Sequence, residues 1–86
     1  MSLLSNNIIP GNHGRIFGTN ATEPADLKII KKSILTLVGI KDVVINNHTF
    51  PREITVYSTK IITIEQVESK VKSVGFHAIP KESLDV

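Results

Sequence analysis

Two stretches of the chain place apolar residues at the same spacing, with the second, third and fourth residues following three, seven and ten positions after the first. They are Leu27, Ile30, Ile34 and Leu37 in one stretch, and Ile64, Val67, Val71 and Val74 in the other. This spacing puts four side chains on one face of an α-helix. Gly39 and Gly75 follow the two stretches, and glycine is the usual residue where a helix ends in a left-handed conformation. The pattern predicts helices near residues 25–38 and 63–74.

The second helix also carries a start signal. Thr63 stands three residues before Gln66, which is the spacing of a capping box. Further along, Glu68 precedes Lys72 by four residues, an orientation that favours a helical ion pair. Both features support a helix that begins at Thr63.

The segments around the helices have the sequences of strands. Residues 43–45 are all β-branched, and residues 54–57 alternate apolar and polar side chains. Between them, residues 46–51 contain two Asn and end in Pro, as expected of a hairpin connection. Residues 15–19 precede the first helix and residues 76–79 follow the second. The predicted order is therefore strand, helix, strand, strand, helix, strand.

This order consists of two βαβ halves, which right-handed crossovers interleave into one sheet. We predict the fold class α+β, as a ferredoxin-like βαββαβ sandwich with an antiparallel four-stranded sheet of order 4-1-3-2 and two helices on one face. The domain spans residues 15–80, between an irregular N-terminal arm at 1–14 and a C-terminal tail at 81–86. The predicted core consists of Ile30, Ile34, Leu37, Val43, Ile45, Ile54, Val56, Val67, Val71 and Val74.

Strand direction in this fold gathers three connections at one end of the sheet. They are the loops at residues 20–26, 46–52 and 75–77, and they contain the acidic pair Glu23 and Asp26 together with His48 and His77. The second and fourth strands become the sheet edges. The far face of the sheet is left to solvent or to a partner.

Composition limits what this domain does. The chain has 86 residues, 41% hydrophobic and 21% charged, as expected of one globular domain. A net charge of +2 and only 5% aromatic residues give little to bind a nucleic acid. No basic, apolar leader stands at the N-terminus, and no apolar run approaches the roughly 20 residues that a spanning helix needs. We expect a soluble, cytoplasmic protein that binds neither nucleic acid nor membrane.

With its elements in this order, the chain resembles the heavy-metal-associated (HMA) domain family of copper chaperones, mercury-binding proteins and metal-pumping ATPases. The matching residues are Ile30, Ile34, Leu37, Gly39, Ile40, Val43, Ile45, Tyr57, Gly75 and Phe76. The resemblance covers roughly residues 15–80. Where that family has Gly-Met-Thr-Cys-x-x-Cys, this chain reads Asn-Ala-Thr-Glu-Pro-Ala-Asp at residues 20–26. Glu23 and Asp26 thus stand at the positions of the two family cysteines.

This replacement changes the expected chemistry. The family binds soft ions such as Cu(I) through two thiolates, and a carboxylate does not substitute for sulfur toward such ions. The chain has no cysteine at all. We therefore expect no copper binding and no cofactor.

Two interpretations of the acidic pair stay open. Glu23, Asp26 and His77, with His48 as a further candidate, supply the oxygen and imidazole ligands that suit Zn²⁺ or a similar divalent ion. The simpler interpretation is structural. Thr22 or Glu23 caps the first helix, a proline stands in its first turn, and the acidic residues complement the helix dipole.

Without thiolate ligands, the resemblance implies a protein-interaction or regulatory module rather than an enzyme. A basic helix side and the apolar edge strand around Val44 offer surfaces for a protein partner or for a homo-oligomer. The basic residues are Lys28, Lys31, Lys32 and Lys41. An acylphosphatase-like enzyme is a further alternative, because residues 14–18 resemble the phosphate-binding turn of that family. Arg15 is its candidate phosphate ligand, and Asn46 or Asn47 its candidate asparagine.

Overall fold

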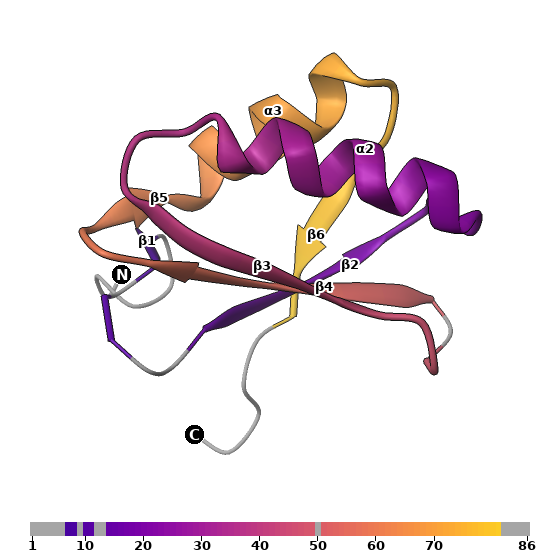
Figure 1. Ribbon diagram of the computed structural model, residues 1–86, viewed down its shortest axis with the longest axis horizontal. Helices are drawn as coiled ribbons and strands as arrows, with labels where there is room; N and C mark the ends of the chain where they lie inside the picture. Colours follow the sequence, from indigo (N-terminus) through magenta and orange to yellow (C-terminus); the bar gives the residue numbers. More distant parts are fainter. Residues whose placement is uncertain (1–6, 9, 12–13, 50, 82–86) are drawn as a thin grey trace.

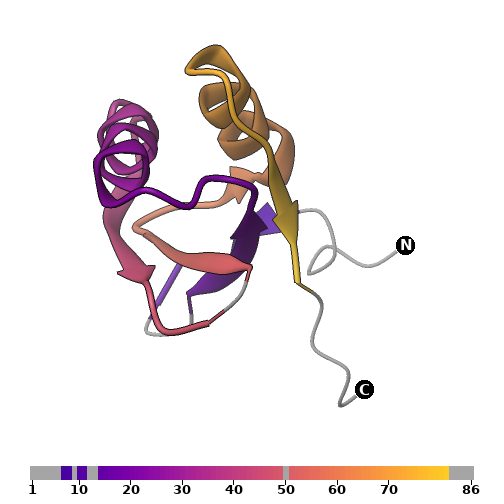
Figure 2. The ribbon, with the colours of Figure 1, turned by 90° about the vertical axis from the view of Figure 1, so that its right-hand side faces the viewer.

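Four strands form one antiparallel sheet, and two helices cover one of its faces (Figure 1 and Figure 2). The computed structural model describes residues 7–8, 10–11, 14–49 and 51–81. The elements of this sandwich are β2 (Arg15–Thr19), α2 (Pro24–Leu35), β3 (Ile40–Asn46), β4 (Arg52–Ser58), α3 (Ile64–Ser73) and β6 (Ala78–Pro80). The strands lie in the order β3-β4-β2-β6, which is the predicted order 4-1-3-2. The ferredoxin-like fold class is confirmed.

A second, very short sheet joins the N-terminal segment to the domain. β1 (Asn7–Ile8) pairs antiparallel with β5 (Ile62–Thr63), so that Ile8 stands opposite Ile62. Both isoleucine side chains are buried in the core, each with 1% exposure. The segment that the sequence assigns to an irregular arm therefore contributes a paired strand and a core residue. Two residues are too short a run for any periodicity to reveal.

Helix α2 ends earlier than the apolar spacing predicts. It runs from Pro24 to Leu35, and the following backbone N–H groups bond three residues back instead of four. Thr36 N–H donates to the Ser33 carbonyl at 3.1 Å, and Leu37 N–H donates to the Ile34 carbonyl at 3.0 Å. This tighter turn keeps Leu37 against the core although it no longer belongs to the α-helix.

Helix α3 has both of the terminal signals that its sequence carries. At its start, Thr63 Oγ1 accepts from the Gln66 N–H at 3.1 Å, and Gln66 Oε1 accepts from the Thr63 N–H at 2.9 Å. This is the predicted capping box. At its end, Gly75 has φ +94, its N–H donates to Lys72, and the Phe76 N–H donates to Val71. Those two bonds form a Schellman motif, which needs a left-handed residue and so favours glycine.

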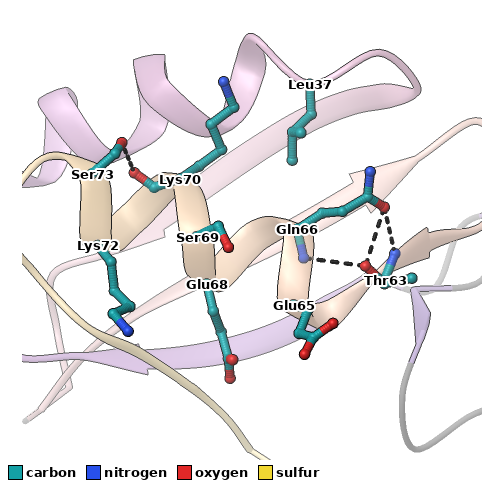
Figure 3. A pocket seen from close by; sticks show the side chains of 9 residues that line it. All are labelled: Leu37, Thr63, Glu65, Gln66, Glu68, Ser69, Lys70, Lys72 and Ser73. Atoms are coloured by element: carbon teal, nitrogen blue, oxygen red, sulfur yellow. Dashed lines mark hydrogen bonds between the residues drawn. The ribbon is translucent and has the colours of Figure 1, made fainter.

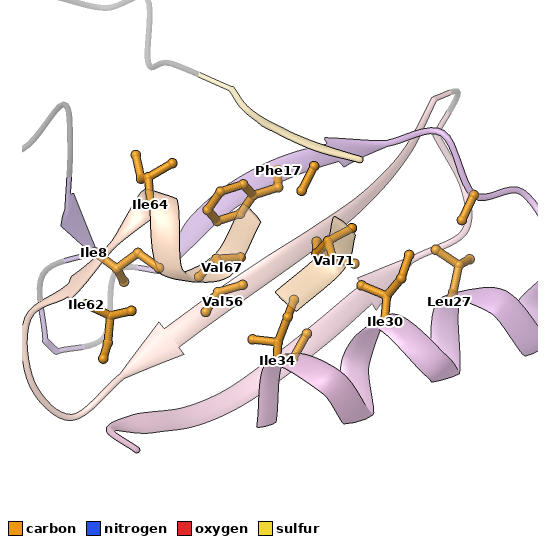
Figure 4. Packing of buried hydrophobic residues seen from close by; sticks show 14 residues of the cluster. Ile8, Phe17, Leu27, Ile30, Ile34, Val56, Ile62, Ile64, Val67 and Val71 are labelled. Atoms are coloured by element: carbon orange, nitrogen blue, oxygen red, sulfur yellow. The ribbon is translucent and has the colours of Figure 1, made fainter. Parts of the chain in front are cut away.

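The core lies between the sheet and the two helices (Figure 4). Seven of the ten predicted core residues are fully buried, namely Ile30, Ile34, Val43, Ile54, Val56, Val67 and Val71. Leu37, Ile45 and Val74 pack against its margin. The core also takes in Ile8, Phe17, Ala21, Leu27, Ile62, Ile64 and Ala78. Ile54 and Val56 point inward on β4, as predicted. Tyr57, on the opposite side of the same strand, is half-buried.

Candidate functional site

The three predicted metal ligands lie at the same end of the sheet, at the start of α2 and in the loop before β6. Glu23 is the exposed N-cap residue of α2, Asp26 is half-buried in the first turn, and His77 is exposed just before β6. The His77 N–H donates to Asn20 Oδ1 at 2.9 Å, which ties the loop before α2 to the loop before β6. Strand direction alone predicts this convergence.

Within residues 7–8, 10–11, 14–49 and 51–81, no group of three His, Asp or Glu side chains could hold a metal ion. Glu23 and Asp26 stand at the N-terminus of α2. The Glu23 carbonyl accepts from the Leu27 N–H at 3.0 Å, although the Glu23 side chain makes no capping bond. Pro24 occupies the first turn, and Asp26 lies near the positive end of the helix dipole.

The residues of the acylphosphatase-like alternative lie far apart. Arg15 begins β2 and Asn46 ends β3. Because β2 and β3 are both antiparallel to β4, they run in the same direction, and the two residues stand at opposite ends of the sheet. Asn46 Oδ1 accepts from the His48 N–H at 2.9 Å, which is the role of a turn residue. Arg15 and Asn46 therefore do not form a phosphate site together.

The sheet face that α2 and α3 leave uncovered, here called the open face, carries exposed apolar side chains. Ile16 is 40% exposed, Val44 46% and Ile79 68%. Each alternates along its strand with an inward residue, so all three point to the open face. Val44 and Ile16 both stand opposite Thr55, and Ile79 stands opposite Gly18. Ile16, Val44, Thr55 and Ile79 thus form a band across all four strands, which we call the apolar band.

The β3 edge beside Val44 is partly closed by its own side chains. Asp42 Oδ1 accepts from the Val43 N–H at 2.8 Å, so this backbone donor is already engaged. The β3–β4 register also shifts between Ile40 and Asp42. Side-chain charge and irregular pairing are two common ways in which edge strands resist the addition of another strand. Between the β3 edge and the open face, the open face is therefore the more accessible surface.

A hollow of about 330 Å³ lies at the end of the open face near the three loops. We call it the Gly18 hollow, and its lining residues are Gly18, Thr19, Asn20, Pro51, His77, Ile79 and Lys81. Gly18 has no side chain to fill the space, and the neighbouring side chains leave a mainly apolar surface. Beside it, Lys81 Nζ and Glu53 Oε2 form an ion pair.

A larger and shallower hollow of about 820 Å³ follows helix α3 (Figure 3). Some of its polar groups bond within the helix itself, as in the Thr63–Gln66 cap and the Ser73 Oγ bond to the Lys70 carbonyl at 2.6 Å. Figure 3 shows Lys70 pointing to the opposite side of the helix from Glu65 and Glu68. These side chains do not converge on a common point, so this surface offers no site.

In the described part of the chain, no helix is long and apolar enough to cross a membrane.

Comparison with known proteins gives a structural neighbour and no close relative. No family model matches the chain, and no curated protein matches it. The fold is similar to the apo form of the HMA domain of copper chaperone for superoxide dismutase, with a TM-score of 0.65. The two chains are 21% identical over 84% of this chain and 74% of that one. At this identity the likeness concerns the fold, and it agrees with the sequence resemblance: the chain has the fold of a heavy-metal-associated domain, built without a single cysteine.

Proposed function

We propose that this protein is a cytoplasmic protein-interaction module, of a regulatory kind, that binds a protein through the open face of an HMA-type sheet. The apolar band carries the proposal. Three aliphatic side chains from three strands, Ile16, Val44 and Ile79, remain 40–68% exposed on the same face of the sheet. Contiguous exposed apolar surface on a small domain marks interaction sites, because leaving it in water is unfavourable.

The chemistry of the open face favours a protein over other partners. Its ionic groups near the Gly18 hollow, Glu53 and Lys81, are paired with each other. An RNA-reading sheet of this topology displays aromatic rings for base stacking. Here the band is aliphatic, and Tyr57 is half-buried beside it. The structural neighbour is a copper chaperone domain, but the cysteine-free chain lacks thiolates for such cargo.

Replacing Val44 by lysine tests this proposal. We expect the unmodified chain to show a mass that rises with concentration in static light scattering from micromolar to millimolar protein. Val44→Lys should lower that rise, because an ammonium group placed in the apolar contact must lose its water. Val38→Lys is the matched control, since Val38 is 78% exposed in the loop after α2. Association that is equally strong in Val44→Lys and Val38→Lys would count against the open face as the binding surface.

A second substitution separates the open face from the β3 edge. Asp42→Ala frees the Val43 N–H without changing the apolar band. If partners bind the open face, this variant associates as the unmodified chain does. A marked gain in association on Asp42→Ala would identify strand addition at the β3 edge as the binding mode.

Zinc binding by Glu23, Asp26 and His77 is a second candidate function. The Asn20–His77 hydrogen bond favours it, because it holds the loop that leads into α2 beside the loop that carries His77. On this hypothesis, calorimetric titration with Zn²⁺ gives a site of about micromolar affinity. That site is lost in Glu23→Ala and kept in Glu65→Ala, which removes the equivalent first-turn acid of α3. A titration that gives only the heat of dilution would reject the hypothesis. Equal zinc binding by Glu23→Ala and Glu65→Ala would reject it as well.

A further inference from the structure

We propose that the Gly18 hollow is a docking site for a second copy of this chain, and that Ile79 of each copy enters the hollow of the other. The inference rests on the proposed function and names the partner and the contact. Three observations carry it: a glycine that the fold does not require, a protruding side chain beside it, and a rim whose charges are already paired.

The first observation concerns Gly18 itself. It lies inside β2, which has a partner strand on both sides. Among the described residues, the glycines with positive φ are Gly11, Gly39 and Gly75, so the Gly18 backbone suits any residue. A Cβ added there would meet Pro51 Cγ at 3.9 Å and the Ile79 carbonyl oxygen at 4.0 Å, which are ordinary contacts. Glycine weakens a strand interior and is typical of positions where another molecule approaches the backbone closely.

The second observation is the position of Ile79. Its side chain is 68% exposed, and it is the register partner of Gly18 on the neighbouring strand. Adjacent strands are about 5 Å apart. A two-fold axis that runs parallel to the strands, midway between β2 and β6, therefore places Ile79 of each copy over Gly18 of the other. The same surface thus serves both copies, as a two-fold dimer requires.

The third observation is the charge around the hollow. The Lys81 side chain is 50% exposed, and it pairs with Glu53, whose side chain is only 15% exposed. Because the pair forms within one chain, the rim is close to neutral, and two copies meet without repulsion between like charges. A charged ligand would have to break this pair to use either group.

The geometry also limits the size of the contact. Val44 lies on β3, three strand spacings from β6 and so about 14 Å from Ile79 across the sheet. The two copies overlap around β2 and β6, with Val44 at the margin. We therefore expect a concentration-dependent dimer of the kind that small interfaces form.

Sedimentation equilibrium with four proteins tests the inference. The unmodified chain should show a monomer–dimer equilibrium. Gly18→Val fills the hollow, and Ile79→Ser removes the inserted side chain, so each should raise the dimer dissociation constant about tenfold or more. Val38→Ser, at an exposed apolar position away from the open face, should leave it unchanged.

Thermal unfolding of the same proteins separates binding from folding. Gly18→Val should melt at the same temperature as the unmodified chain or higher, because valine favours strands. If Gly18→Val does not fold, Ile79→Ser carries the test, since this side chain is mostly in solvent. A loss of dimer without loss of stability supports a contact between copies.

Other outcomes overturn the inference in distinct ways. A dimer that persists in Gly18→Val and Ile79→Ser but is lost in Val44→Lys keeps the proposed function and rejects the Gly18 hollow as the docking site. An unmodified chain that stays monomeric to millimolar concentration rejects the second copy as the occupant. The open face is then left to a different protein.

Discussion

Replacing Ile34 by alanine is expected to lower the free energy of unfolding by about 2–5 kcal/mol. Ile34 is fully buried on the core face of α2, so the loss of its side-chain carbons leaves a cavity as well as a loss of buried apolar surface. Small domains are usually stable by about 5–15 kcal/mol, so this loss is a large part of the total. Urea unfolding followed by circular dichroism measures it directly.

The neighbouring residue provides the control. Leu35 is 41% exposed, and Leu35→Ala removes the same number of carbon atoms from the next position of the same helix. Its cost should fall below about 1 kcal/mol, because most of that side chain is already in water. Equal costs for the two variants would show that the buried face of α2 is not the one that contains Ile34.

The helices and the order of the strands were predictable because each depends on local pattern. The apolar spacing of α2 and α3 places one stripe inward, and the capping box at Thr63 fixes one helix start. Once the order of elements is known, chirality and pairing leave few topologies, and the ferredoxin-like sheet is among them. The meeting of Asn20 and His77, 57 residues apart in the chain, follows from that topology.

Other core positions depend on contacts that no local pattern reports. Ile8 is buried only because β1 reaches β5 from the other end of the chain. Phe17 is the central β2 residue of the core. Gly18 interrupts the alternation of apolar and polar residues that would predict its burial. Ala21 is buried in a loop because the surrounding elements close over it. Each requires tertiary structure before its environment is defined.

The candidate site shows the same division. The position of the acidic pair at the start of α2 follows from sequence, but the arrangement of its side chains relative to His77 does not. The role of Asp42 depends on a bond to its own neighbour at a sheet edge. The Gly18 hollow depends on three separate segments that line it, at residues 18–20, 51 and 77–81. A glycine in a predicted strand was the signal available in the sequence, and by itself it indicated only a weak strand.

Placing cysteines at positions 23 and 26 should create a copper site in this chain. Glu23 is the N-cap of α2 and Asp26 is the third residue after it. In a capping box the side chain at each of these positions bonds to the backbone N–H of the other, so the two side chains start close together and two thiols placed there can reach one ion. The partial positive charge of the helix N-terminus also favours thiolate formation. We expect the double variant Glu23→Cys, Asp26→Cys to withdraw about one equivalent of Cu(I) from a chromogenic chelator, since soft ions select sulfur ligands.

The unmodified chain and the double variant Glu23→Ser, Asp26→Ser should both leave Cu(I) with the chelator. The serine pair keeps the size of cysteine but replaces each sulfur by oxygen, so the comparison isolates ligand softness from loop shape. Stoichiometric withdrawal by the unmodified chain would show that carboxylate and imidazole groups suffice here, and would return metal transfer to the possible roles of this fold. A folded cysteine pair that fails to bind would show instead that the loop before α2, anchored by the Asn20–His77 bond, no longer adopts a conformation that brings residues 23 and 26 to one ion. If only the cysteine pair captures Cu(I), the acidic residues at positions 23 and 26 are enough to explain why the unmodified chain does not bind it. The sheet and helices that position residues 23 and 26 are then suited to a copper site.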